Sequence, residues 1–189
     1  MRIISGTAKG TKLYTLDGLE TRPTLDRVKE SLFNIIFNEI TDSTVLDLFS
    51  GSGAIGLEFA SRGAKKVYLC DKSKDACNII KKNIEKTHLE EKVELINSDF
   101  VKAIREVKNK KIDIVYLDPP YKTDFIKIAI EELLKTENLT EDTLLIAETD
   151  EEERIINQIE KIKGIEIADK RKYGRAYILF LKKMNGKEE

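Results

Sequence analysis

The stretch "VLDLFSGSGAIGLEFA", residues 45–60, joins an apolar strand pattern to a helical pattern through a glycine-rich turn. Gly51, Gly53 and Gly56 follow the spacing G-x-G-x-x-G, which permits a tight turn and a close approach of a ligand to the backbone. The spacing alone is a weak signal, because tight packing of a helix on a strand uses the same glycines. It predicts the first strand–turn–helix unit of a parallel sheet.

Outward from this unit, strand patterns alternate with helical patterns along most of the chain. Strands are expected at 44–49, 66–70, 92–96, 112–117 and 143–148, and helices near 53–62, 73–87, 99–108, 124–135 and 151–162. Two final strands, 164–173 and 175–183, turn around Gly174 and must include one antiparallel strand. This alternation predicts an α/β, Rossmann-like fold with a seven-stranded, mostly parallel sheet, helices on both faces, and the order 3-2-1-4-5 for the first five strands.

The N-terminal residues follow a different pattern. Residues 2–15 alternate weakly around Gly10 and predict a β-hairpin, and Thr24 is a candidate N-cap for the helix that follows. Residues 1–29 carry six basic and three acidic side chains, a net charge of +3, so a total of −1 leaves −4 on the remainder. We therefore expect a basic extension over residues 1–22 that meets an anion, and one domain over residues 23–189. A solvated surface would explain the charge equally well.

Composition excludes several other classes of protein. The chain is 41% hydrophobic and 35% charged, it contains no apolar run of membrane-spanning length, and its N-terminus lacks the apolar segment of a signal peptide. A cytoplasmic location is therefore expected. Cys70 and Cys77 are expected to be reduced core residues, and His88 is the single histidine, so no metal site is expected.

Three carboxylates are expected at the carboxyl ends of the first three parallel strands. Asp47 would repel a pyrophosphate but would suit an ammonium group, and Asp71 can accept hydrogen bonds from ribose hydroxyls. Asp99 could accept a bond from an adenine amino group, although helix capping is an alternative for Asp71 and Asp99. Together these sites outline S-adenosylmethionine rather than NAD. The expected cofactor contacts are Asp47, Phe49, Gly51, Gly53, Asp71, Lys72, Asp99 and Phe100.

The stretch "IVYLDPPYKTDF", residues 114–125, ends a buried strand with a carboxylate and two prolines. This strand is expected beside the first, at the switch point of the sheet where ligands bind. Asp118 and the carbonyl of Pro119 could accept hydrogen bonds from an exocyclic amino group of a base, and the prolines would hold that carbonyl rigidly. Tyr121 could stack on the base, which is worth about 1–3 kcal/mol. The alternative is a Pro-Pro turn with a capping aspartate and a core tyrosine.

These motifs resemble those of a known family. "DLFSGSGAIG" and "DPPY" are similar to motifs I and IV of amino-directed methyltransferases that use S-adenosylmethionine. "RIISGTAKGTKL" and "TRPTLDRVKESLFNII" resemble the head of the bacterial small-subunit ribosomal RNA guanine-N2 methyltransferase family, often called RsmD, and the likeness extends to the terminal "GRAYILFLKK". The resemblance implies the complete sheet order 3-2-1-4-5-7-6 of a class I methyltransferase. It also implies methylation of one guanine of 16S ribosomal RNA, guanine 966, within a partly assembled small subunit.

Carried over position by position, the resemblance implies that Asp118, Pro119 and Tyr121 contact the target base. It also places Arg22, Pro23 and Thr24 near the site entrance, and the alternative for these three residues is a turn at the entry of a helix. The expected RNA contacts are Arg2, Lys9, Lys12, Arg22, Thr24 and Arg27. A monomer without a membrane or metal partner is expected.

Three alternatives remain open. A DNA adenine-N6 methyltransferase shares the DPPY motif, but the chain leaves no room for a target-recognition domain. A protein glutamine methyltransferase would carry Asn rather than Asp before the two prolines. A non-catalytic RNA-binding assembly module would have no need of two acceptors at an amine.

Overall fold

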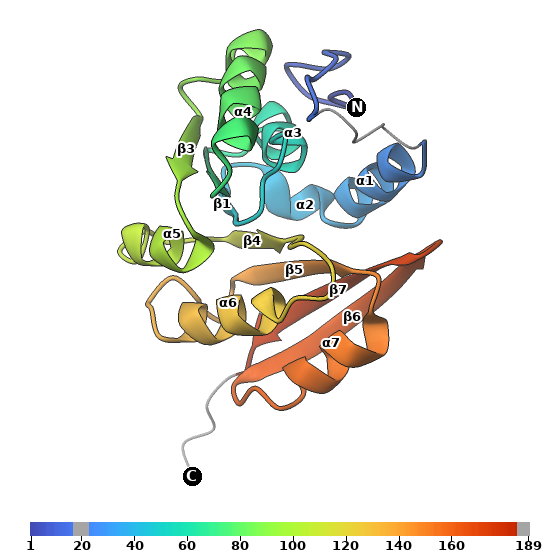
Figure 1. Ribbon diagram of the computed structural model, residues 1–189, viewed down its shortest axis with the longest axis vertical. Coiled ribbons are helices and arrows are strands. Elements are labelled where there is room, and N and C mark those ends of the chain that lie inside the picture. Colours follow the sequence, from blue (N-terminus) through green and yellow to red (C-terminus); the bar gives the residue numbers. More distant parts are fainter. Residues whose placement is uncertain (17–22, 185–189) are drawn as a thin grey trace. The chain divides into compact units, whose positions relative to one another are not determined.

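The computed structural model describes residues 1–16 and 23–184, and for residues 23–26 it describes the backbone alone. Helices and strands alternate through most of this part of the chain (Figure 1). The helices are α1 (Pro23–Ile35), α2 (Phe37–Ile40), α3 (Ala54–Ser61), α4 (Lys74–Thr87), α5 (Phe100–Glu106), α6 (Phe125–Leu134) and α7 (Glu152–Ile159). The strands are β1 (Thr44–Asp47), β2 (Lys66–Asp71), β3 (Val93–Asn97), β4 (Ile114–Leu117), β5 (Leu144–Thr149), β6 (Ile165–Tyr173) and β7 (Ala176–Lys183).

The strands form one seven-stranded sheet of order β3-β2-β1-β4-β5-β7-β6, which confirms the predicted order. The pairs β1–β2, β2–β3 and β4–β5 are parallel, whereas β7 runs antiparallel to both β5 and β6. β1 ends at Asp47 and β4 begins at Ile114, so both strands are shorter than predicted. The chain divides into two compact units, Met1–Phe100 and Val101–Glu189, which are described separately below.

In the first unit, α3 packs on β1 and β2, and α4 packs on β2 and β3. Gly56 shows why the third glycine of the spacing is required. A Cβ atom at this position would lie 2.1 Å from Cδ2 of Leu69 and 3.0 Å from Cγ1 of Val67 on β2. A larger residue would force the side chains of β2 or α3 itself to shift, so this glycine serves close helix–strand packing.

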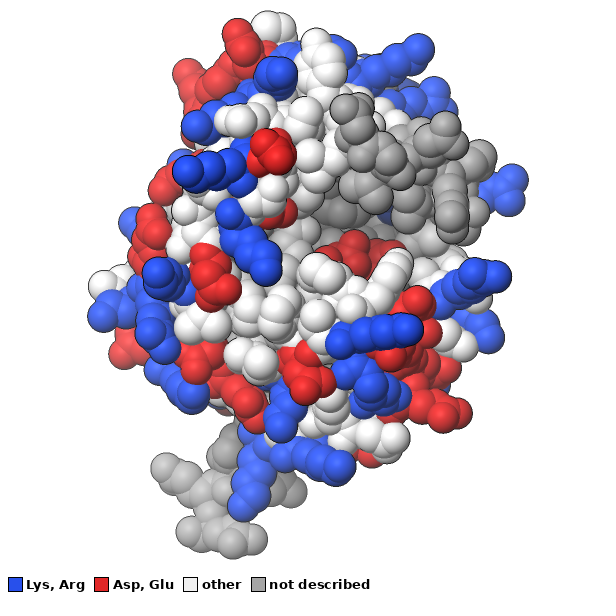
Figure 2. Space-filling view, in the orientation of Figure 1, with Lys and Arg blue, Asp and Glu red and all other residues white. Residues whose placement is uncertain are grey.

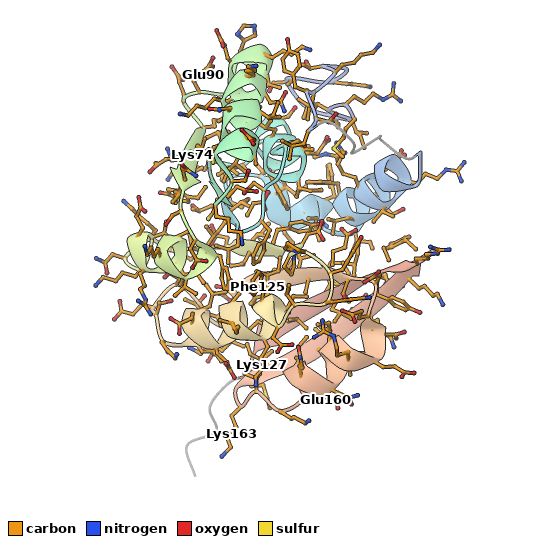
Figure 3. All side chains as sticks on the ribbon, viewed as in Figure 1. Lys74, Glu90, Phe125, Lys127, Glu160 and Lys163 are labelled. Atoms are coloured by element: carbon orange, nitrogen blue, oxygen red, sulfur yellow. The ribbon has the colours of Figure 1, made fainter. Side chains whose placement is uncertain are left out.

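In the second unit, all four residues of β4 are buried, as expected of a central strand with both faces covered. β5 pairs with β4 on one side and with β7 on the other. α6 and α7 contact each other, and α7 also contacts β6. Side chains of the helices extend outward from this unit in Figure 3, where Phe125 marks the start of α6 and Glu160 follows the end of α7.

The predicted N-terminal hairpin is present as a turn with little strand structure. Arg2 and Lys12 form one antiparallel bridge pair, and the Ile3 amide donates to the Thr11 carbonyl at 3.0 Å. A buried carboxylate on α3 holds this segment in place within the first unit. Both oxygens of Glu58, which is fully buried on α3, accept hydrogen bonds from backbone amides of the segment. The predicted boundary at residue 22 borders the residues outside the described part and stays a prediction.

Lys29 corrects part of the charge argument. It is one of the six basic residues counted over positions 1–29, but only 4% of its side chain is exposed. Its Nζ lies 3.1 Å from Glu58 and donates to the Arg2 carbonyl at 2.6 Å. Arg62 completes the cluster, since its Nε donates to Glu58 at 2.7 Å. Lys29 therefore neutralises a buried carboxylate and adds nothing to the charge that faces solvent.

The helix after the head also differs from the prediction. α1 begins at Pro23, so Thr24 lies inside its first turn and is not the N-cap. Proline is favoured at this first position because its missing N–H would have no partner within the helix. The predicted single helix is divided at Ile36, where α1 has ended and α2 has not begun.

Both cysteines are core residues, as predicted. Cys70 on β2 and Cys77 on α4 are unpaired and buried. Burial raises the pKa of the Cys70 thiol to about 12 and also raises the pKa of Cys77. Within residues 1–16 and 23–184, no helix has the length and apolar composition needed to cross a membrane.

Candidate active site

The glycine-rich loop lies between β1 and α3. Gly51 and Gly53 have φ angles of +54° and +79°, in the left-handed region that favours glycine. The Gly53 amide donates to the Ser50 carbonyl at 2.6 Å, which closes the turn just before α3. In the described part of the chain, no heavy atom outside Gly51 and its two neighbours lies within 4 Å of the position that a Cβ on Gly51 would occupy, so the backbone at Gly51 borders open space. A ligand can approach the main chain there.

Asp71, at the end of β2, holds this loop in place. One carboxylate oxygen accepts a hydrogen bond from the Gly51 amide at 2.9 Å, and the other accepts from the Ser73 amide at 2.8 Å. Ser73 itself caps α4, since its Oγ accepts from the Ala76 amide at 3.3 Å. The alternative interpretation of Asp71 as the cap of α4 is therefore wrong, and its role toward a ribose stays a prediction.

Asp47 ends β1 and is 1% exposed. The pKa of its carboxyl group is raised to about 7, mainly by burial and to a lesser extent by the neighbouring charge of Asp71, while a weak hydrogen bond from the Phe49 amide at 3.4 Å opposes the shift. A carboxyl group with this pKa changes its charge near neutral pH. Its ionised form would be favoured by a cation such as the ammonium group predicted from the sequence.

Two aromatic rings accompany these carboxylates. Phe49 and Phe100 lie with centroids 5.1 Å apart and planes inclined at 46°. Asp99 stands directly before α5, the position of a helix cap, and it is exposed, as is Lys72. The predicted cofactor residues therefore cluster on the loops after β1, β2 and β3 of the first unit. No group of three or more His, Cys, Asp and Glu side chains in the described chain is arranged to hold a metal ion.

The DPPY motif follows β4 in the second unit. Asp118 is half-buried, Pro119 is buried, and Tyr121 is 64% exposed. The alternative in which Tyr121 is a core residue is therefore wrong. A large aromatic ring exposed beside a rigid Pro-Pro corner is suited to stacking on a planar ligand.

The loop after the motif is held by residues that sequence reasoning missed. Arg154, on α7, donates to the Thr123 carbonyl at 2.8 Å, to Glu151 at 2.7 Å and to Asp124 at 2.8 Å. Glu151 in turn accepts from the Lys122 amide at 3.0 Å. The one signal in the sequence is a single arginine in the acidic stretch "DEEER". These bonds tie residues 122–124 to α7.

A hydrogen-bonded pair of side chains, which was also not predicted, lies on the strands just before the motif. Tyr116, on β4, donates its hydroxyl hydrogen to Glu148 on β5 at 2.5 Å. Burial raises the pKa of Glu148, and the hydrogen bond from Tyr116 opposes the shift. The pair joins two adjacent parallel strands immediately before the motif begins.

The predicted RNA-contacting residues lie partly within the described chain. Arg2, Lys9, Lys12 and Arg27 are all exposed. Figure 2 shows Lys and Arg side chains at the upper right of the molecule, over the N-terminal segment. Arg22 lies outside the described residues, and so does the side chain of Thr24.

The sheet order, the reversed β7 and the glycine-rich loop after β1 define a Rossmann-like fold of the class I methyltransferase type. The chain belongs to the family described as "Conserved hypothetical protein 95", whose model matches residues 1–182.

Relatives with known names support this assignment. Ribosomal RNA small subunit methyltransferase D of Haemophilus influenzae is 37% identical over 158 residues, which cover 82% of each chain. YlbH of Bacillus subtilis is 32% identical over 97% of this chain and 99% of its own. The solved structure of yhhF from Escherichia coli matches with a TM-score of 0.80 at 26% identity, covering 97% of both chains.

Proposed function

We propose that this protein transfers a methyl group from S-adenosylmethionine to the exocyclic N2 of one guanine of 16S ribosomal RNA, in a partly assembled small subunit in the cytoplasm. The observation that carries the proposal is the Asp118–Tyr121 motif at the end of β4. The chain belongs to the family described as "Conserved hypothetical protein 95", and a named relative is a ribosomal RNA small subunit methyltransferase. By family resemblance the target is guanine 966.

The loops of the first unit fit S-adenosylmethionine by their chemistry. The open backbone at Gly51 admits a ligand, and Asp47 would pair with its ammonium group. Asp71 and Asp99 would accept hydrogen bonds from the ribose and the adenine, and the Phe49–Phe100 pair would pack on the apolar parts. The three carboxylates would disfavour a pyrophosphate, and the exposed Lys72 would offset only one of them.

The acceptor motif would act on the amine. The lone pair of an exocyclic amine is delocalised into the ring, so the nitrogen is a poor nucleophile. The carboxylate of Asp118 and the carbonyl of Pro119 would accept hydrogen bonds from the two N–H groups of the amine. These bonds would help the lone pair to localise on the nitrogen. When bound, the cofactor would supply a methyl group from its sulfonium sulfur, which would keep the electron pair of the broken C–S bond. Asp118 would stabilise the positive charge that develops on the amine, and the methylated amine would then lose a proton to water.

The test is methyl transfer by the full-length protein. Purified protein and labelled S-adenosylmethionine are incubated with small ribosomal subunits from cells that lack the enzyme, and the methylated base is mapped. Label at N2 of one guanine supports the proposal. Label in duplex DNA but not in ribosomal RNA would favour an adenine methyltransferase instead. Tight RNA binding without any transfer would identify a binding module.

Cofactor affinity is expected to depend on pH through Asp47. The pKa of its buried carboxyl is raised to about 7, so the neutral form predominates below that pH and the carboxylate above it. An ammonium group binds the carboxylate, so affinity for S-adenosylhomocysteine should rise as the pH increases from about 6 to about 7, with release of a proton. Calorimetry in buffers of different ionisation enthalpy measures both effects. Asp47→Asn should abolish the rise, and an unchanged rise would show that another group titrates.

Replacing Asp71 should weaken cofactor binding for two reasons. Asp71→Ala removes the proposed ribose acceptor and also frees the Gly51 amide that the carboxylate now holds. The loss of a charged acceptor predicts a dissociation constant about ten to a hundred times larger for S-adenosylhomocysteine. Asp75→Ala, an exposed change in the first turn of α4, is the matched control and should leave affinity unchanged. Equal affinities for the two variants would limit Asp71 to a structural role.

A further inference from the structure

A hollow on the outer side of α4 combines an aromatic ring with two lysines. It has a volume of about 420 Å³ and is lined by Tyr14, Lys82, Glu85 and Lys86. Tyr14 is 48% exposed, and Nζ of Lys86 lies 4.3 Å from the centroid of its ring. Lys82 and Lys86 are both exposed, and neither has a salt-bridge partner among the described residues. In Figure 3, Lys74 marks the start of this helix, and Glu90 lies in the turn after its end.

The ring is held at a defined place by a buried amide. Asn83, on the inner side of α4, is 0% exposed. Its Oδ1 accepts from the Tyr14 amide at 2.8 Å, and its Nδ2 donates to the Tyr14 carbonyl at 2.9 Å. The same Nδ2 donates to the carbonyl of Ser52, in the glycine-rich loop, at 2.8 Å. The exposed tyrosine is thus anchored through its backbone to α4 and to the loop proposed to bind the cofactor.

We infer that Tyr14, Lys82 and Lys86 form a contact site for an unpaired nucleotide of the RNA substrate, with the base against the Tyr14 ring and the phosphates near the two lysines. This inference rests on the proposed function, because it names a further surface for the same substrate. None of the three residues was predicted from the sequence as an RNA contact.

The chemistry of the hollow favours RNA over other partners. Lysines four residues apart on one helix face repel each other, and Glu85 offsets only one of the two charges, so a further anion such as a phosphate would relieve the repulsion between Lys82 and Lys86. A pair of cations beside an exposed aromatic ring is the combination by which proteins hold single-stranded nucleic acid. Glu85 leaves the hollow with a net charge of +1 and offers an acceptor to a base amino group. The exposed Arg2, Lys9 and Lys12 of the same N-terminal segment extend the basic surface.

The test is a binding titration of full-length variants against a short single-stranded RNA and a duplex of the same length. Tyr14→Ala should weaken binding of the single strand about five- to a hundredfold, as expected for the loss of one stacked base, and should affect the duplex much less. Tyr14→Phe keeps the ring and should bind nearly normally. The double variant Lys82→Gln/Lys86→Gln should lower the slope of log affinity against log salt by about 1.4, the value for two phosphate contacts on a single strand.

The matched control removes two lysines elsewhere. Lys161→Gln/Lys163→Gln makes the same charge change at exposed positions after α7, where Lys163 extends away from the ribbon (Figure 3), and should leave the slope unchanged. Affinity for S-adenosylhomocysteine and the melting temperature report whether each variant is folded. Equal slopes for the two double variants, together with normal binding by Tyr14→Ala, would overturn the inference.

The proposed function is measured separately, as methyl transfer to small subunits. If the wild-type protein transfers no methyl group but the Tyr14 and lysine variants still lose RNA affinity, the proposed function fails and this contact site stands. If transfer occurs and the variants bind RNA normally, the contact site fails alone.

Discussion

Replacing Glu58 by alanine is expected to destabilise the protein by about 3–5 kcal/mol, the usual cost of removing one partner from a buried ion pair. Glu58 is fully buried and accepts from Lys29, Arg62 and two backbone amides of the N-terminal segment. Without the carboxylate, the buried ammonium of Lys29 would lose its counter-charge, and the amides of Ile4 and Ser5 would lose their acceptors. A loss of this size is a large part of the stability of a typical domain, about 5–15 kcal/mol.

Chemical denaturation followed by circular dichroism measures this loss, and limited proteolysis reports whether residues 1–14 detach. The matched control is Glu94→Ala, because Glu94 forms an exposed ion pair with Lys66 at 3.0 Å. Exposed pairs contribute about 0.2–1 kcal/mol, so the control should change stability little. A loss below about 1 kcal/mol for Glu58→Ala would mean that the ion cluster does not hold the segment.

Replacing Asp118 by asparagine is expected to slow methyl transfer by a factor on the order of 10²–10³, as for the loss of one preorganised electrostatic partner. The substitution keeps the shape and one carbonyl acceptor but removes the negative charge. If this charge stabilises the amine as it becomes positive, the effect belongs mainly to the transition state. The affinities for cofactor and RNA should then change little.

Single-turnover transfer at saturating cofactor and substrate isolates the chemical step. Asp142→Asn, an exposed change in the loop before β5, is the control for the loss of one charge. A near-normal rate for Asp118→Asn would show that the aspartate only shapes the turn. A rate loss that is matched by weaker RNA binding would assign Asp118 to substrate affinity instead.

Local patterns in the sequence were sufficient to predict the strands of the sheet. The apolar runs of the strands and the glycines of the first turn act over short distances, and Gly56 is required by a neighbour only 13 residues away, Leu69. The complete order of the strands did not follow from these patterns and was implied by the resemblance to class I methyltransferases. The strand ends were less predictable, because β1 stops at Asp47 where the chain turns into the loop.

The ion cluster and the loop supports could not be read from the sequence. Lys29 and Glu58 are 29 residues apart, and nothing local distinguishes this lysine from the exposed basic residues around it. Arg154 holds a loop 30 residues earlier in the chain, at Asp124. Such pairs depend on how distant segments meet, so a charge count assigns Lys29 to the surface although it is buried.

The buried thiols make this protein convenient for site-specific labelling. Maleimides react with thiolates, and Cys70 and Cys77 are both buried with raised pKa values, so little thiolate is accessible near neutral pH. A single cysteine introduced at an exposed position, such as Lys163→Cys, would carry a fluorophore without first replacing the native cysteines. Fluorescence anisotropy with this label would follow binding to a whole ribosomal subunit in real time.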